Sequence, residues 1–476
     1  MHLGERRELK SNREGAIMFH TSKLSPSRLP AMRELPAEAG FQAGDVLVVF
    51  GELFARGYAN GIVDEAMRRG LKVIRSTVGR RTPEGELRAL TNEELATQPQ
   101  PFINIPLEAG FDLESIEVGD TGSARTAVSL FDGVKLSDWM QAKVDMQALE
   151  RARERGRVRF RDQVRRYMRE LKSHVTPGKN VIFCHTMAGG VPRTKVIMPV
   201  MNRVFKGQGD RHVSSQALYE SDLGRFALMN FDEVTAETFK VLIEESATLR
   251  NEIEKSGGRA SYLAFGYHGT EILSKGQMRW QTYTPYFQGW AKMKLEDYAA
   301  EAQAQGLRAC VYNCPEILTN SSSIFIGVEV SLYPLLGALR TSLSSAEGLG
   351  RKRIESVLQE ATQLVKPELR DNQAYIDKIQ EFVDAYVSSG IIQRHSEFAK
   401  WPQASQLEQM EKMLSASEEL FALNADEKQP MTSLLSEQVF RATGALMFHD
   451  AWTCSRPVVW LGHDAMASAL ASGRTL

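Results

Sequence analysis

The sequence has few cysteines, no excess of charge of either sign and no long apolar run. Four cysteines in 476 residues provide no disulfide framework, which is typical of a reducing compartment. The formal net charge of -1 argues against general attraction to nucleic acid or anionic lipid. The longest apolar stretch, 324–339, is interrupted by Glu329 and Pro334 and is too short to cross a bilayer. The first residues have no apolar run of signal-peptide length. These absences predict a soluble cytoplasmic protein. Its oligomeric state stays open between monomer and homodimer.

What the sequence does have is an alternation of short β-branched runs and helical segments. The first two expected strands flank a helix over 62–69 that ends at Gly70, which makes a βαβ unit. Such an alternation predicts an α/β protein with a doubly wound parallel sheet of the Rossmann type. Strands are expected at 45–50, 71–76, 101–106, 180–184, 260–269 and 308–313. We expect an N-terminal arm over 1–43, a dinucleotide-binding catalytic domain over 44–340 and a helical C-terminal extension or cap over 341–476, of which 400–476 is helical and then irregular.

The turn after the first expected strand is rich in glycine but lacks the G-x-G-x-x-G pattern. Its glycines are Gly51, Gly57 and Gly61, with Tyr58 beside the second. A glycine turn lets backbone N–H groups at a helix N-terminus approach a pyrophosphate, where the helix dipole favours negative charge. Its place in a βαβ unit favours cofactor binding, and the alternative is a strand–helix turn without a ligand.

The segment after the second expected strand lacks the carboxylate that usually binds a ribose 2′-hydroxyl. It contains Ser76, Arg80 and Arg81 instead. An arginine there can accommodate a 2′-phosphate, so this segment favours NADPH over NADH, although both cofactors stay open. The alternative is a loop with two arginines facing solvent.

A tyrosine and a lysine form the candidate catalytic pair. Tyr283 follows the expected strand over 260–269 after an insertion, and Lys292 lies in the helix that comes next. The charge of a nearby lysine lowers the pKa of a phenol, which can then give a proton to a developing oxyanion. Tyr286 is a competing donor that the sequence does not exclude. The pair predicts hydride transfer coupled to proton donation.

The eight residues between Tyr283 and Lys292, together with the segment Ala291-Lys-Met-Lys-Leu-Glu296, resemble the V-type bacterial enoyl-ACP reductases and the trans-2-enoyl-CoA reductases, within the short-chain dehydrogenase superfamily. The segment 319–323 resembles that family's Thr-x-x-Ser-Ser. The chain departs from the family at Ala59, where the family has glycine, and by an insertion over 271–281.

The resemblance implies an enzyme of fatty-acid metabolism that uses NADPH or NADH to reduce an α,β-unsaturated acyl thioester carried by CoA or acyl carrier protein. Hydride would reach the β-carbon, and Tyr283 would protonate the enolate with the help of Lys292. Tyr267 would be a second donor near the thioester carbonyl. Lys292 would also hold the nicotinamide ribose, and Ile317 and Thr319 would complete the cofactor contacts.

Two other functions remain open from the sequence. The same Tyr/Lys pair could reduce a ketone or oxidise an alcohol, because both reactions need a proton donor beside an oxygen. A Rossmann-type binding or scaffold protein without catalysis is the second alternative, because the glycine turn is altered.

Three further features are expected to be structural. Arginines are dense over 151–169, and the acidic residues among them indicate a solvated helix face more than a contact with phosphates or nucleic acid. Cys310 and Cys314 have no second ligand pair with zinc spacing, so no metal site is expected. His185 follows the expected strand over 180–184 near the nicotinamide position, where a lone histidine is more often structural than catalytic.

Overall fold

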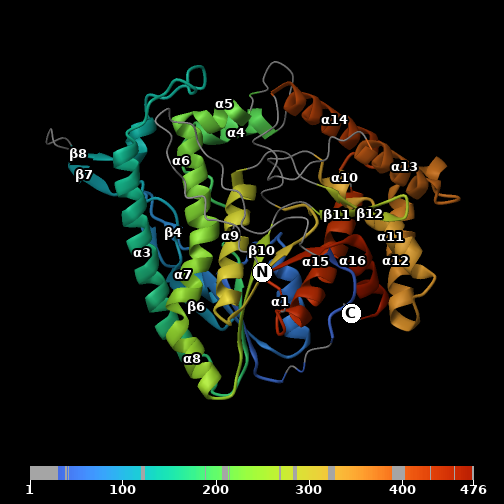
Figure 1. Cartoon of the computed structure of the whole chain (residues 1–476), viewed down its shortest axis with the longest axis horizontal. Helices are drawn as coiled ribbons and strands as arrows, with labels where there is room; N and C mark the ends of the chain where they lie inside the picture. Colours follow the sequence, from blue (N-terminus) through green and yellow to red (C-terminus); the bar gives the residue numbers. More distant parts are fainter. Residues whose placement is uncertain are drawn as a thin grey trace.

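The computed structural model describes residues 31–37, 40, 42–118, 124–187, 189–205, 213, 215–266, 270–281, 287–319, 327–388, 403–428, 430–454 and 456–473 (Figure 1). Tyr267, Tyr283 and Tyr286 lie outside these ranges.

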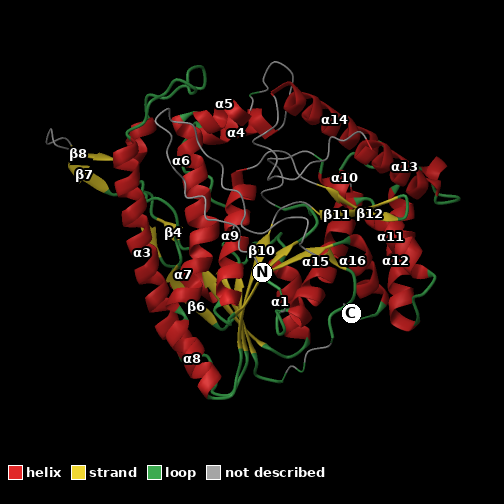
Figure 2. Ribbon diagram, viewed as in Figure 1, coloured by secondary structure: helices red, strands yellow, loops and turns green. Residues whose placement is uncertain are grey.

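A parallel sheet of eight strands forms the centre of the molecule, as predicted (Figure 2). All six strands expected from the sequence belong to it. Two more were not expected, the two-residue β1 in the N-terminal arm and β14 near the C-terminus. In spatial order the strands are β1 (Ala31–Met32), β14 (Val458–Leu461), β13 (Arg308–Asn313), β10 (Ala260–Gly266), β9 (Val181–His185), β2 (Val46–Glu52), β3 (Lys72–Thr77) and β6 (Phe102–Pro106).

The strand order reverses between β2 and β9. From β2 the chain proceeds outward through β3 to β6, whereas from β9 it proceeds the other way through β10 and β13 to β14. The two central strands pair in regular parallel register, Val46 opposite Val181 and Phe50 opposite His185. Such a reversal is the switch point at which open α/β sheets bind their ligands, outside the carboxyl ends of the strands.

Helices cover both faces of the sheet because alternate residues of each strand are apolar on opposite sides (Figure 1). In β2, Leu47 and Val49 belong to one buried cluster, and Val46, Val48 and Phe50 belong to the other. The first cluster joins the sheet to α1 (Ala59–Arg68), α10 (Val328–Leu332), α11 (Leu335–Leu343), α12 (Gly348–Leu364), α13 (Ala374–Ser388), α14 (Gln403–Phe421), α15 (Pro430–Asp450) and α16 (His463–Ala471). The second joins it to α3 (Met146–Lys172), α7 (Thr238–Glu245), α8 (Ala247–Lys255) and α9 (Phe287–Ala304).

A third apolar cluster connects the first half of α3 with the start of α9. It is completed by α4 (Ile197–Phe205), α5 (Ser215–Glu220) and α6 (Asp222–Phe231), and a π-helical segment, Asp232–Glu237, links α6 to α7. Short elements elsewhere include the helix α2 (Asn92–Ala96), the 3₁₀ segments Ala127–Phe131 and Pro367–Leu369, and the two-stranded ribbons β4 (Arg80–Arg81) with β5 (Leu87–Arg88), and β7 (Ile116–Val118) with β8 (Ala124–Thr126).

The C-terminal region is part of the central sheet, which corrects the expectation that 400–476 is helical and then irregular. β14 lies between β13 and β1, and Val458 pairs with Val311. The helices around it also pack on the first βαβ unit, where α15 lies against α1. A strand of four residues between two helical segments leaves too short an apolar run to distinguish from a buried helix turn.

The insertion over 271–281 is part of an antiparallel hairpin formed by β11 (Thr270–Ser274) and β12 (Gln277–Gln281). Its buried Glu271 accepts a hydrogen bond from Arg33 of the N-terminal arm. Burial raises the pKa of Glu271 to about 7, although the charge of Arg33 opposes the shift. Ser274 donates a hydrogen bond to Asp384 of α13. The hairpin therefore ties the segment after β10 to both the arm and the C-terminal helices.

Several arginines of helix α3 form ion pairs with neighbouring elements, whereas the sequence predicted a solvated helix face. Arg153 and Arg157 both bind Glu233 of the π-helical segment, with shortest N···O distances of 2.6 Å. Arg161 binds both Glu244 and Glu245 of α7, at 2.6 and 2.9 Å. These cations hold α3 against its neighbours, because Glu233 is buried and would be costly without a partner. Within the described ranges, no helix is long and apolar enough to cross a membrane.

Candidate active site

The candidate site lies where the strand order reverses, at the carboxyl ends of β2 and β9. A cavity of about 220 Å³ opens there. Its lining comes from the ends of β2, β3, β6 and β9 and includes Glu52, Val78, Leu107, Thr186 and Met187. The exposed Phe54, from the loop after β2, adds an aromatic wall. This is the location and the mixed lining expected of a nucleotide site in a doubly wound sheet.

The glycines of the turn after β2 have different surroundings. Gly51 has φ +118°, and a Cβ there would lie 2.6 Å from the Thr186 hydroxyl, so glycine is needed for the close approach of the two strand ends. Gly57 faces open space, with no atom within 4 Å of the position of a Cβ. Its backbone is therefore accessible just before α1 begins.

Gly61 supports the site through packing. A Cβ on Gly61 would overlap the carbonyl oxygen of Phe440 and lie 2.7 Å from its carbonyl carbon. Gly444 of α15 lies opposite, and a Cβ there would be 2.6 Å from the amide nitrogen of Ile62. The two glycines let α1 and α15 touch backbone to backbone, so the side of Gly61 that would carry a Cβ faces α15. The cofactor contact expected of Gly61 stays a prediction.

Tyr58 reaches across the crevice from the start of α1. Its ring stacks on Phe265, with centroids 6.0 Å apart, and its hydroxyl donates a hydrogen bond to the carbonyl of Pro315, just after β13. Desolvation raises the pKa of Tyr58 well above its usual value, and Cys314 and Glu316 act in the same direction. Tyr58 is thus a neutral link between the glycine turn and the loop after β13.

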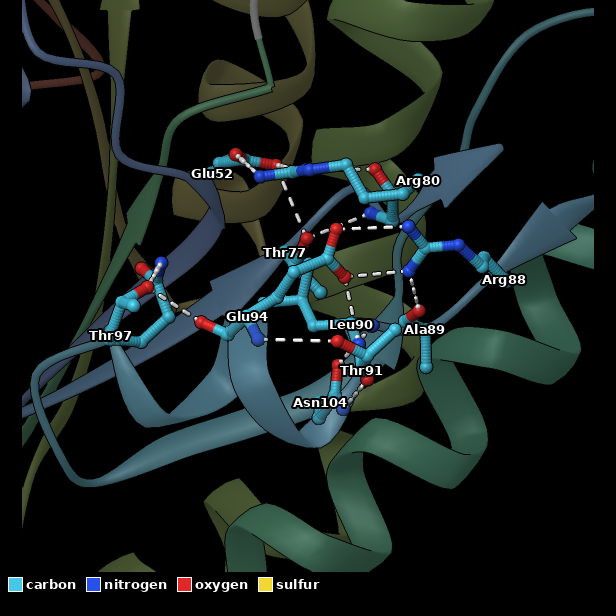
Figure 3. A network of polar contacts seen from close by, with 12 residues as sticks. Glu52, Thr77, Arg80, Arg88, Ala89, Leu90, Thr91, Glu94, Thr97 and Asn104 are labelled. Carbon is cyan, nitrogen blue, oxygen red and sulfur yellow. Dashed lines mark hydrogen bonds and ion pairs between the residues drawn. The ribbon is translucent and has the colours of Figure 1, made fainter. Parts of the chain in front are cut away.

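Ser76 and Arg80 are both held by the end of β2. The buried Ser76 hydroxyl contacts the carbonyls of Val49 and Gly51 at 2.5 and 2.9 Å, which fixes the glycine turn to β3. Arg80 binds the carboxylate of Glu52 through two hydrogen bonds of 2.9 and 3.0 Å (Figure 3). The predicted solvent-facing or phosphate-binding Arg80 therefore already has a carboxylate partner.

Arg81 has partners as well. It binds Glu108, which Arg193 of the loop after β9 also contacts. Burial by itself would raise the pKa of Glu108. The charges of Arg193 and Arg159 and the hydrogen bonds from Arg193 and Arg81 outweigh burial, so the pKa of Glu108 is lowered. Neither arginine of this segment is a free cation.

Lys292 lies on α9 at the ends of β9, β10 and β13. It is 4% exposed, and its Nζ donates a hydrogen bond to the carbonyl of Phe265 in β10. Burial lowers the pKa of Lys292 to about 8, and Cys314 at the end of β13 opposes the shift. A buried lysine at the end of these strands fits the role predicted from the sequence.

Glu296 and Asn313 form a buried pair that sequence analysis missed. Glu296 lies one turn after Lys292 on α9 and accepts a hydrogen bond of 2.8 Å from Asn313 Nδ2. Burial raises the pKa of Glu296 to about 8, so the side chain is uncharged at neutral pH. A Cβ on Gly266 would lie 2.8 Å from the Asn313 carboxamide carbon, so this glycine makes room for the pair. In the sequence, this glutamate stands out only as part of the family resemblance.

His185, which was expected to be structural, lies buried between the sheet and α7. It is 1% exposed, and its Nε2 lies 2.8 Å from the Thr238 hydroxyl of α7. Burial and the charge of Lys292 keep its pKa well below the usual value, so the ring is neutral.

Ile317 and Thr319 lie in the loop after β13. Ile317 is buried in the core on the α15 side, and Thr319 is half-buried. Between them, the Leu318 amide donates a hydrogen bond of 2.9 Å to Ser436 of α15. The cofactor contacts expected of Ile317 and Thr319 stay a prediction. Tyr283 and Tyr267, the other members of the expected catalytic set, lie outside the described residues.

Comparison with known proteins identifies the family of this chain. The family model described as "Enoyl-acyl carrier protein reductase FabMG" matches residues 28–470. A solved structure described as the apo structure of FabMG is 42% identical, covers 94% of this chain and 99% of that one, and has a TM-score of 0.84. Another, described as NADH-bound FabMG, is 38% identical, with coverages of 92% and 98% and a TM-score of 0.67.

A search of curated proteins found no match. The enoyl-ACP reductase part of the predicted resemblance is confirmed, whereas the V-type and trans-2-enoyl-CoA parts stay predictions. The extent and identity of the matches show that the chain belongs to the FabMG family of enoyl-acyl carrier protein reductases.

Proposed function

We propose that this protein uses NADH to reduce the carbon–carbon double bond of an α,β-unsaturated acyl thioester carried by acyl carrier protein. The observation that supports this most is the buried Lys292 with a pKa lowered to about 8, at the strand ends beside the glycine turn. The relative described as NADH-bound favours NADH as the cofactor.

The residues of the crevice fit a dinucleotide. The open space beside Gly57 and the N-terminus of α1, which no side chain caps, suit a pyrophosphate, because the helix dipole favours negative charge there. The cavity bounded by Phe54, Val78 and Leu107 suits an adenosine. Lys292 suits the nicotinamide ribose. The cofactor would supply the hydride that goes to the β-carbon of the thioester.

Side chains of the protein would stabilise the developing charge and supply the proton. Addition of hydride to the β-carbon leaves negative charge on the thioester oxygen, and the Tyr283 hydroxyl would give its proton to that enolate. The charge of Lys292 lowers the cost of that transfer by favouring the phenolate that remains. Glu296 is uncharged at neutral pH and adds no negative charge to oppose it. Tyr267 would donate a second hydrogen bond to the enolate oxygen.

The test is NADH oxidation by the purified protein with crotonyl-ACP, crotonyl-CoA and a panel of ketones. We expect thioester turnover, and a loss of kcat of roughly 100-fold or more in Lys292→Met and in Tyr283→Phe. Lys294→Met is the matched control, because Lys294 lies on the same helix but binds Glu237 at 2.6 Å, and it should keep most of the activity.

Other results would contradict the proposal. Turnover of ketones without thioesters would favour the ketone reductase instead. Binding of neither NADH nor NADPH would favour the binding or scaffold protein.

A further inference from the structure

Glu52 is the last residue of β2, but its carboxylate lies at the end of the neighbouring strand, β3. In the pairing of β2 with β3, Val48 is opposite Ile74, yet Glu52 is opposite Ser76. Four residues of β2 thus span the length of two residues of β3. Gly51, with φ +118°, lies inside this irregularity and allows the backbone to turn. The bulge carries Glu52 toward the segment that follows β3.

Hydrogen bonds and an ion pair hold the Glu52 side chain at the end of β3 (Figure 3). One oxygen accepts hydrogen bonds from the Thr77 hydroxyl and the Val78 amide, both at 3.2 Å. Arg80 binds both oxygens, at 3.0 and 2.9 Å. The Glu52 side chain keeps 17% of its surface exposed, and it lines the cavity of about 220 Å³. It is therefore both held in position and accessible from the crevice.

The location of this carboxylate has a chemical meaning. In dinucleotide-binding sheets, an acidic residue after the second strand accepts a hydrogen bond from the ribose 2′-hydroxyl of NAD, and an arginine there accommodates the 2′-phosphate of NADP. Here the segment after β3 supplies only arginines, Arg80 and Arg81. Glu52 brings a carboxylate to the same end of β3, and Arg80 is already bound to it.

We propose that Glu52, by its own charge and by binding Arg80, makes this site select NADH over NADPH. Its carboxylate accepts a hydrogen bond from the 2′-hydroxyl of NADH. A 2′-phosphate in the same place meets that negative charge, and the arginine that would bind it is occupied. The inference rests on the proposed function, because it specifies the cofactor of the same site.

The experiment measures Kd for NADH and for NADPH by fluorescence titration of wild-type protein, Glu52→Gln, Arg80→Gln and the double variant. We expect wild type to bind NADH more tightly. Glu52→Gln should weaken NADH binding roughly tenfold and strengthen NADPH binding by a similar factor, since the acceptor for the 2′-hydroxyl loses its charge and Arg80 is released. Arg80→Gln should retain the preference for NADH, and the double variant should lose the gain in NADPH binding.

Glu94→Gln is the matched control, because Glu94 forms the neighbouring ion pair with Arg88 at 2.6 Å and is not among the residues that line the cavity. It should leave both Kd values unchanged. If wild type binds NADH but Glu52→Gln keeps the wild-type ratio of Kd values, the inference fails while the proposed function stands. A wild type that prefers NADPH also overturns it. If wild type binds neither nucleotide, both fail.

Discussion

Replacing Gly61 with alanine tests how closely the two helices beneath the candidate site pack. α1 and α15 meet at Gly61 and Gly444, and the added methyl group would overlap the carbonyl oxygen of Phe440. The atoms it meets are backbone, so no side chain can rotate away. We expect the two helices to move apart and the free energy of unfolding to fall.

Two effects of opposite sign decide how far Gly61→Ala lowers the free energy of unfolding. Alanine is more favourable than glycine in a helix by up to about 1 kcal/mol, and Gly61 lies in the first turn of α1. Overpacking a tight contact costs about 1–3 kcal/mol and more where the backbone must move. With the Cβ 2.7 Å from the Phe440 carbonyl carbon and 3.3 Å from the Gly444 Cα, we take the upper end of that range. The net loss is then about 2 kcal/mol.

Urea unfolding followed by circular dichroism measures this loss. Gly57→Ala is the control, because its Cβ would enter open space at the same end of α1, and it should leave the stability close to that of wild type. A Gly61→Ala protein that is as stable as wild type, or more stable, would refute the reasoning. Helix propensity would then outweigh a contact that is looser than described.

Two further predictions concern titration of buried groups. The pKa of Lys292 is lowered to about 8, so the side chain is charged below about pH 8, and kcat/KM for NADH should fall as the pH rises through that value. Lys294→Gln should show the same fall at alkaline pH. A kcat/KM that stays constant up to about pH 9.5 would contradict the role assigned to Lys292. The pKa of Glu296 is raised to about 8, so the folded protein holds a proton that the unfolded chain releases from about pH 4.3 upward, and stability falls over that window. Glu296→Gln should remove about 3 kcal/mol of this loss in the free energy of unfolding at about pH 7, which urea unfolding at about pH 5 and 7 measures. An unchanged dependence of stability on pH would contradict the raised pKa of Glu296.

The sheet could be predicted because its strands are short, β-branched and separated by helices. The run Arg308–Asn313 begins and ends where the sequence predicted, and the first βαβ unit also formed as expected. β14 could not be predicted in the same way. Its four residues form a strand because β13 and β1 offer backbone partners on either side, and that depends on the fold of distant segments.

The position of a candidate site residue was predictable where it follows from the element that carries the residue. Lys292 lies on the expected helix at the expected strand ends. Glu52 was missed because its position depends on a register shift between two strands, which leaves no periodic signal in either. The packing role of Gly61 was missed for a similar reason, since its partner Gly444 lies near the other end of the chain.

The contact between Gly61 and Gly444 also bears on the order in which the protein can mature. Residues of the glycine turn leave the ribosome early, but the helix that braces α1 from behind is synthesised long afterwards. Contacts between distant segments form late because loop closure must precede them. The nascent chain therefore carries a glycine turn that lacks its support until α15 has emerged. A chain that stops before α15 retains the turn without its brace.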